Sequence, residues 1–382
     1  MKIKKILLGL ALATSTGLFM AQESFAAPNT NIMTSVNWSY IFSDRKQISQ
    51  EELNQVFEEE KSKYEALSNK DKWKNGVLGF YLENDDKEAV YALTRADDKE
   101  GTYLSARQRN SSDDAASMDN MKQAIENIAM VEAKRQNDRG IDGAHLDSLG
   151  ITSFMMAVGQ GNANYSAGTP DHATVFNTSE NLAWNNQKQA ARSIEQWWDE
   201  EKQVYDYLRS QGYQTESEMQ AYLSKKENID ALSKKFRSVG GYTPSTVGHY
   251  TNMVDSVNQD KTAGYGVRKG ENNYYAHSLV LSSGVVGKYY TIDEYRNLFD
   301  NYYQRMKKDL GVTDEKYKNS VINLRKAVEN NKKIVAYAEN YMANNYMPKE
   351  TKEKLTKLVG KQKNILERIE VILVKLEAKI SN

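Results

Sequence analysis

The sequence predicts an α+β protein with a helical C-terminal region. Three observations support this fold class: helical and strand-like patterns alternate through the middle of the chain, the strands are short and close together, and heptad spacing dominates the last part. Short neighbouring strands favour an α+β sandwich over a doubly wound parallel sheet. A length of 382 residues is enough for two or three compact units.

The composition excludes several classes of function. The chain has 51 basic and 51 acidic residues, and this balance argues against binding nucleic acid through a chain-wide positive charge. It has no cysteine, which excludes disulfides, thiolate metal sites and a cysteine nucleophile. Any histidine-based site must therefore use His145, His172, His249 or His277.

Residues 1–26 have the features of a secretory signal peptide. Three lysines precede an apolar stretch at residues 6–20, and Ser24-Phe25-Ala26 has the small-x-small pattern of a cleavage site. The apolar stretch is shorter than the ~20 residues that span a bilayer. We therefore expect cleavage after Ala26, no transmembrane segment, and a secreted product that is at most held non-covalently at the cell surface. An exported chain without cysteine is typical of a Gram-positive bacterium.

Residues 27–116 form the first region of the mature chain, for which we expect α+β structure. Residues 51–67 place apolar side chains at a period near 3.6, and Ser49 is a candidate helix N-cap with Glu52 three positions later. Two apolar runs, separated by a turn-like Asn-Asp-Asp, predict a pair of strands at residues 77–82 and 89–93.

Residues 117–290 form the middle region, in which helices and strands are mixed. Helical patterns occur at residues 118–139, 146–158 and 187–212. A loop rich in Gly, Asn and Ser is expected from Gly159 onward. Strand patterns occur at residues 246–254 and, as an expected hairpin, at residues 263–267 and 274–281.

Residues 291–382 form the last region, which predicts an antiparallel helical hairpin. Apolar side chains recur in steps of four and three over residues 317–342 and again over residues 358–376. Asn331 and Gln362 interrupt these two series, as polar residues that fix register do. Either the hairpin is a structural stalk, or it makes a homodimer or a cell-envelope contact, which the lysine excess of its second half favours.

One group of residues in the middle region has the composition of a chemical site. His172 follows Asp171 in an expected loop, Glu180 and Glu200 lie in aromatic-containing segments, and His249 follows a glycine. Two imidazoles with carboxylates suit a divalent transition metal such as zinc. A carboxylate beside an imidazole equally suits a general base. On spacing alone, a single histidine of this kind is more often a structural group than a ligand.

Four segments of the middle region resemble the CAP superfamily, which comprises cysteine-rich secretory proteins, antigen 5 and pathogenesis-related 1 proteins. The segments are similar to the family's Gly-Glu-Asn-Leu signature, its Trp-x-x-Glu helix, its Gly-His-Tyr-Thr signature and the strand that follows. In this chain they read Glu180-Asn181-Leu182-Ala183, Trp197-Trp198-Asp199-Glu200, Gly248-His249-Tyr250-Thr251 and Ala263-Gly264-Tyr265-Gly266-Val267. Their order and spacing agree over residues 118–285, somewhat under half of the chain.

The resemblance implies a three-layer α-β-α sandwich with a central antiparallel sheet and a cleft that holds two histidines and two glutamates. By motif position the metal-binding residues, with zinc as the expected ion, are His172, Glu180, Glu200 and His249. Glu180 and Glu200 are also the candidate catalytic residues. Asp171 and Glu201 are neighbours that the motifs leave open as alternatives.

The resemblance also implies residues that support the cleft. Asn181 is expected to hydrogen-bond a loop, Tyr250 to support the cleft by packing, and Trp197 to form part of the cleft wall. His145 begins no matching motif and is expected at a helix start or on the surface. His277 lies in a strand pattern, where we expect a place on the sheet.

Three departures from the family pattern indicate a bacterial branch. Ser179 replaces the usual glycine, Asn252 replaces a common glutamine, and Asp255 stands where animal and plant members often have tryptophan. The segments around Glu180 and His249 are also similar to the CAP-like domain of surface exclusion proteins of Gram-positive conjugative plasmids. Those proteins are typically anchored to the cell wall, whereas this chain has no Leu-Pro-x-Thr-Gly sorting motif.

Two functions follow from the resemblance. The first is a secreted binding module whose cleft engages an envelope, lipid or protein ligand. The second is a metal-dependent, peptidase-like hydrolase in which His172 and His249 hold a metal that activates water, with Glu180 or Glu200 as the base. We favour the binding module, because a fold does not fix a reaction and no nucleophile stands out.

Overall fold

The computed structural model describes residues 48–96, 103, 109–138, 140–236, 245–254, 260–270, 273–310, 315–344 and 346–381. The predicted signal peptide and Asp255 lie outside these residues. The chain divides into two compact units, one of residues 28–310 and one that contains residues 311–382. Each unit is described by itself.

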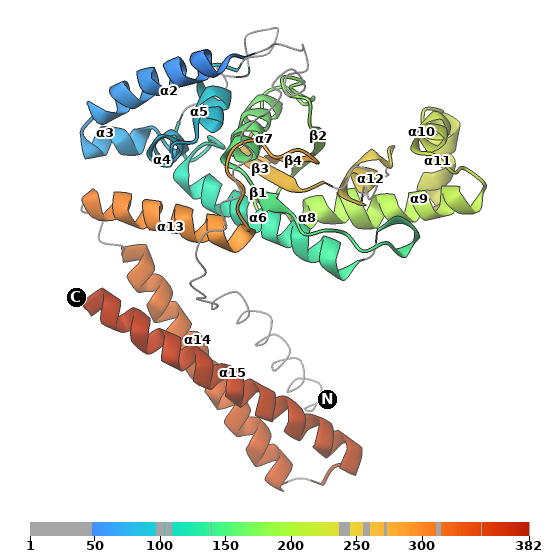
Figure 1. Ribbon diagram of the computed structural model, residues 1–382. Coiled ribbons are helices and arrows are strands. Elements are labelled where there is room, and N and C mark those ends of the chain that lie inside the picture. Colours follow the sequence, from blue (N-terminus) through green and yellow to red (C-terminus); the bar gives the residue numbers. More distant parts are fainter. Residues whose placement is uncertain are drawn as a thin grey trace. The chain divides into compact units, whose positions relative to one another are not determined.

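The unit of residues 28–310 is built around a small mixed sheet (Figure 1). Its four strands, in the spatial order β1-β3-β4-β2, are β1 (Gly150–Ile151), β3 (Thr262–Lys269), β4 (Tyr275–Ser282) and β2 (Ser179–Asn185). β4 is antiparallel to both β3 and β2, which confirms the predicted hairpin of residues 263–267 and 274–281. β1 runs parallel to β3, so the sheet is not wholly antiparallel. The α+β class is confirmed.

Helix α7 (Ser153–Ser166) packs along β3 and is buried almost throughout. The expected loop after Gly159 is therefore wrong, and the helix expected at residues 146–158 begins later, at the N-cap Thr152. Helix α7 is explained by its close packing on glycines of strand β3 better than by the helix propensity of its own residues. A Cβ added to Gly264 would lie 1.8 Å from the backbone oxygen of Met155, so only glycine permits so close an approach.

The described N-terminal part is helical. It contains α2 (Gln50–Glu65), α3 (Asn69–Lys74), α4 (Val77–Glu83) and α5 (Lys87–Thr94). The predicted first helix is confirmed, and the Ser49 hydroxyl accepts a hydrogen bond from the Glu52 amide at 3.0 Å, as an N-cap does.

The two strands predicted at residues 77–82 and 89–93 are wrong, because both runs are helical. Every residue from 77 to 82 is buried, so the run has no polar face, whether it is read with the helical or with the strand periodicity. A short apolar run of this kind cannot be assigned to helix or strand by periodicity. The expectation of α+β structure for residues 27–116 therefore fails in the parts described, residues 48–96, 103 and 109–116, which contain no strand.

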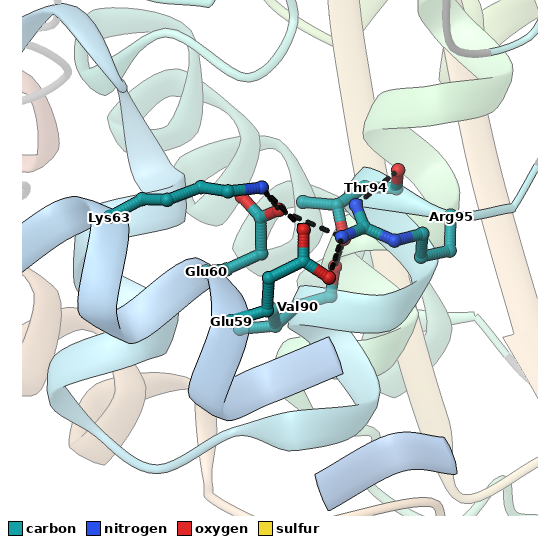
Figure 2. A network of polar contacts seen from close by, with 6 residues as sticks. All are labelled: Glu59, Glu60, Lys63, Val90, Thr94 and Arg95. Carbon is teal, nitrogen blue, oxygen red and sulfur yellow. Dashed lines mark hydrogen bonds and ion pairs between the residues drawn. The ribbon is translucent and has the colours of Figure 1, made fainter. Parts of the chain in front are cut away.

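A polar network joins the end of α5 to α2 (Figure 2). Arg95 Nη2 lies 3.0 Å from Glu60 Oε1 and 3.1 Å from Glu59 Oε2, and Lys63 Nζ lies 2.6 Å from Glu59 Oε1. Glu60 is 8% exposed, so its charge needs these partners. The network links the end of α5 to α2, whose buried apolar residues also share one core.

Long helices complete this unit. The predicted helix at residues 118–139 is confirmed as α6 (Met118–Asn137), and α13 (Ile292–Asp309) packs against it and against α3. The hydroxyls of Tyr64 on α2 and Tyr302 on α13 lie 3.2 Å apart and are buried. α13 thus belongs to the core that also contains the N-terminal helices.

The helical pattern at residues 187–212 is confirmed, with a π-helix inside it. In order, the segment forms α8 (Ala191–Ile194), the π-helix η3 (Glu195–Glu200) and α9 (Glu201–Ser210). The short helices α10 (Glu216–Leu223) and α11 (Lys226–Lys235) follow. The strand predicted at residues 246–254 is wrong, because these residues contain helix α12 (Gly248–Val254). The β-branched residues before Gly248 misled the assignment.

The second unit confirms the predicted helical hairpin, formed by α14 (Glu315–Asn344) and α15 (Lys349–Ser381). Ion pairs of Lys332 with Glu370 and of Glu339 with Lys363 show that the helices run antiparallel. The buried residues of α14 follow the predicted series, namely Val321, Val328, Val335, Ala338 and Met342.

On α15 the predicted seam is shifted. The buried residues are Leu355, Val359, Gln362, Leu366 and Leu373, whereas Leu358, the first of the predicted series, is 39% exposed. Two overlapping rows of this helix both satisfy steps of four and three, so spacing cannot choose between them. Side chains at residues 317 and 376 lie outside the described ones.

No described helix is long and apolar enough to cross a membrane.

Candidate histidine–carboxylate cleft

A cleft of about 370 Å³ lies beside strand β2 and contains both predicted histidines. Its lining residues are Pro170, Asp171, His172, Leu182, Ala183, Trp184, Gln196, Trp197 and His249. They come from the loop before β2, from β2 itself, from the π-helix η3 and from α12. The structure therefore brings His172 and His249 to one solvent-reachable hollow, although they are 77 positions apart in the chain.

His172 is held by Glu180. Its Nδ1 lies 2.6 Å from Glu180 Oε2. The other carboxylate oxygen of Glu180 accepts hydrogen bonds from Asn162 Nδ2 at 2.8 Å and from Ser278 Oγ at 2.6 Å. The hydrogen bond to Glu180 raises the pKa of His172, because the carboxylate stabilises the imidazolium. The Glu180 side chain is 7% exposed, so the histidine faces solvent and its partner does not.

His249 is held in the same way by Glu201. Its Nδ1 lies 2.5 Å from Glu201 Oε1, and Glu201 Oε2 accepts a hydrogen bond from the Tyr250 amide at 3.1 Å. The Glu201 side chain is fully buried, and this burial raises the pKa of its carboxyl group, while the hydrogen bond to His249 opposes the rise. In both His172 and His249, Nδ1 thus faces the carboxylate of one glutamate.

Glu200, expected as a metal ligand and as a candidate catalytic residue, lies elsewhere. Its Oε1 lies 2.7 Å from Arg192 Nη1, and its other oxygen is buried with no hydrogen-bond partner in the described structure. Burial raises the pKa of Glu200, and the ion pair with Arg192 opposes the rise. The structure therefore places Glu201, the alternative that the motifs left open, beside His249.

Helix geometry explains the exchange. The π-helix η3 ends at Glu200, and α9 starts at Glu201. Trp197 lines the cleft, and a residue four positions later lies near it on the same helix face, whereas one three positions later is rotated away in a widened turn. The Trp-x-x-Glu pattern fits this segment twice, as Trp197 with Glu200 and as Trp198 with Glu201, so the pattern alone cannot choose between the two glutamates.

The three residues expected to support the cleft each have defined contacts. Asn181 Nδ2 donates to the backbone oxygen of His249 at 2.9 Å, although that segment is a helix rather than a loop. Trp197 Nε1 donates to the Leu182 oxygen at 2.8 Å, and its ring centroid lies 6.4 Å from that of His249. Tyr250 is buried and packs edge-on against the ring of Trp198 at 5.5 Å.

The other two histidines lie apart from the cleft. His145 is exposed, as expected. His277 is on the sheet, in β4, and is completely buried. Its Nε2 lies 2.7 Å from the Gln187 oxygen, which only accepts, so Nδ1 accepts from the Tyr265 hydroxyl at 2.9 Å. Burial lowers the pKa of His277 to about 4, which keeps it neutral.

A second hollow of about 370 Å³ shares His172 with the cleft. This part is lined by Asn162, His172, Thr174, Phe176, Asn177, Thr178 and Glu180. Sequence reasoning missed Asn162 and Ser278, the two residues that hold Glu180. Asn162 lies in the segment expected as a loop, and Ser278 belongs to no motif, although strand pairing brings it near Glu180 on the same face.

A larger hollow, of about 510 Å³, lies elsewhere on this unit and shares only Tyr250 with the predicted site. Its charged lining includes Lys202 and Asp206, which already form an ion pair at 2.5 Å. The cleft with the two histidines is the stronger candidate for a functional site, because its polar groups are positioned by buried partners.

A metal ion in the cleft would have to be bound through the Nε2 atoms of the two histidines. Because each Nδ1 faces a carboxylate, the Nε2 atoms of His172 and His249 remain for a ligand. A carboxylate on the second nitrogen is typical of metal-binding histidines. Among the described residues, no three or more His, Asp or Glu side chains gather closely enough to hold an ion. An ion bound by the two histidines would therefore need water or ligand atoms as its remaining donors, as in an open rather than a closed structural site.

Comparison with known proteins adds no further constraint: no protein-family model, curated protein or solved structure matches the chain.

Proposed function

We propose that this chain is a secreted binding module of the CAP superfamily that acts at a bacterial cell envelope. In this proposal His172 and His249 hold a divalent ion, zinc above all, through Nε2, and a lipid or protein ligand completes the site. One observation carries the proposal: two histidines from distant segments line one cleft, each oriented by its own carboxylate. The signal-like residues 1–26 support export.

The surroundings of the glutamates favour binding over hydrolysis. Glu180 accepts three hydrogen bonds, and Glu200 forms an ion pair with Arg192 outside the cleft. Glu201 is buried beneath His249. A general base needs to reach a water in the cleft, whereas Glu200 and Glu201 do not line the cleft and Glu180 is held by its three hydrogen bonds. Their arrangement serves to hold the two imidazoles in place.

Titration of the metal-free chain with zinc, followed by calorimetry, tests the proposal. We expect about one ion per chain, and we expect His172→Ala combined with His249→Ala to abolish binding, because both Nε2 donors are removed. His145→Ala is the matched control, since His145 is exposed and lies outside the cleft. Binding should also weaken as the pH falls, because the raised pKa of His172 favours its protonated form.

Two results would contradict this function. Unchanged stoichiometric binding in the double variant would remove the two histidines from the site. Turnover of peptide, ester or peptidoglycan substrates that requires both histidines would instead support the hydrolase.

A further inference from the structure

We propose that helix α15 binds an anionic lipid surface through one side, here called its outer side. This side carries Leu358, Ile365, Ile372, Lys354, Lys361 and Arg368. The proposal concerns the unit of residues 311–382 and does not depend on the metal cleft. It starts from the row that the sequence predicted as the seam. Leu358, Ile365 and Ile372 are seven residues apart and are left out of the buried seam: Leu358 is 39% exposed, and the other two are half-buried. A seven-residue repeat keeps a row on one side of a helix.

A basic row lies beside this apolar row. Lys354, Lys361 and Arg368 are also seven residues apart, and all three are exposed. Lys361 and Arg368 each follow an apolar member by three residues, a spacing that makes side chains neighbours on a helix surface. Lys354 pairs with Glu350 at 2.6 Å, an exposed pair that stabilises little. Lys361 and Arg368 have no ion pair among the described residues.

The acidic residues of α15 lie mainly on other sides. Glu370 pairs with Lys332 of α14, and Glu367, adjacent to Arg368, points about 100° away from it on the helix. The outer side of α15 therefore combines apolar and basic side chains over more than two turns. Helices of this composition lie in the plane of a membrane interface, with apolar side chains in the lipid and lysines near anionic headgroups.

Charge decides between the possible occupants of this surface. Against an antiparallel second copy of α15, the basic row would meet another basic row, which is unfavourable, and in a parallel pair it would face the flank that already packs on α14. A soluble anionic polymer would satisfy the basic row and leave the apolar row in water. An anionic bilayer satisfies both rows. Each basic residue near such a surface strengthens binding roughly fivefold.

Sedimentation with vesicles tests this assignment. The chain from Ala27 onward is mixed with vesicles of phosphatidylcholine alone or with phosphatidylglycerol, so that the apolar residues 6–20 cannot contribute. We expect binding only to the anionic vesicles, and weaker binding at high salt. Lys361→Glu with Arg368→Glu should weaken it by at least about 25-fold. The matched control is Lys326→Glu with Lys333→Glu, which makes the same charge change on exposed positions of α14 and should retain binding within about twofold.

A second variant tests whether the apolar row contributes to binding in addition to the charge. Leu358→Ser with Ile365→Ser keeps the net charge and should also weaken vesicle binding, while circular dichroism checks that α15 remains helical. Four results would overturn the assignment. They are no binding of the unaltered chain to anionic vesicles, equal loss in the α14 control, undiminished binding in the serine variant, and vesicle-independent self-association that the serine variant abolishes.

Discussion

Glu200 and Glu201 are neighbours in the chain but have opposite surroundings. Glu201 lies beneath His249 at the cleft, and Glu200 forms an ion pair with Arg192 away from it. At the scale of single residues, one position of the helix thus decides whether a carboxylate orients a possible metal ligand or stabilises the surrounding structure.

Neutralising each glutamate separates these roles. Glu201→Gln should weaken metal binding by about 10- to 100-fold, because the carboxylate that orients His249 is lost. Glu200→Gln should leave metal affinity unchanged and lower the free energy of unfolding by roughly 1–2 kcal/mol, since Arg192 loses a charged partner. Calorimetric titration and urea unfolding of both variants check this. The reverse pattern would restore Glu200 to the site.

The residues of the site were predictable where a motif spans contiguous sequence. His172, Glu180 and His249 could be placed from their segments, and so could Asn181. The choice between Glu200 and Glu201 could not be made, because the Trp-x-x-Glu pattern fits both and the π-helix is not visible in the sequence. Asn162 and Ser278 could not either, since their role depends on tertiary pairing between α7, β2 and β4.

At the scale of elements, Gln362 is the clearest local conflict in the hairpin. It lies in the seam of α15, is 2% exposed, and its Oε1 has no hydrogen-bond partner in the described structure. A buried polar atom without a partner costs about 1–3 kcal/mol. Polar residues in such seams can still fix the register of two helices.

Replacing this residue should stabilise the hairpin. Gln362→Leu should raise the free energy of unfolding by about 1–3 kcal/mol, because the unsatisfied amide is replaced by an apolar side chain. Asn364→Leu, at an exposed position of the same helix, is the control and should change it by less than about 0.5 kcal/mol. Denaturant unfolding followed by circular dichroism measures both. A destabilised Gln362→Leu would mean that the amide has a partner.

Elements with long, one-sided patterns were predicted well, and short apolar ones were not. α2, α6 and α14 could be read from periodicity, and Ser49 marked the start of the first. α4 and α5 were mistaken for strands because burial on every side removes the periodic signal. Helix α7 contradicts the local preference of its glycines, since packing against β3 overrides propensity.

At the scale of the whole molecule, two buried groups give stability opposite pH dependences. Asp86 is 5% exposed, and burial raises its pKa to about 7. Ser153 Oγ donates to it at 2.6 Å, and Lys288 lies near enough to oppose the rise. Between about pH 4 and 7 the folded state keeps a proton that the unfolded chain loses, so stability falls as the pH rises. For His277, with a lowered pKa of about 4, stability falls as the pH drops below about 6.5.

Single variants should reveal these opposing contributions. Relative to the unaltered chain, Asp86→Asn should make stability rise more steeply with pH between about 4 and 7, and His277→Gln should do the opposite. The limiting change in slope is about 1.4 kcal/mol per pH unit. Urea unfolding at several pH values measures it, and the difference between variant and unaltered chain cancels other titrating groups such as His172. Parallel profiles for both variants would contradict the assignment.

Helix α7 meets β3 on one flank and the N-terminal helices on the other, where Gln160 Oε1 accepts from the Tyr81 hydroxyl at 3.0 Å and Ser153 contacts Asp86. Residues 117–290 therefore do not contain all of the packing partners of α7. A fragment of these residues alone would expose the apolar and hydrogen-bonding side of α7 that the preceding helices cover. Such a trimmed fragment should precipitate or stay unfolded, and a usable truncation has to keep the preceding helices.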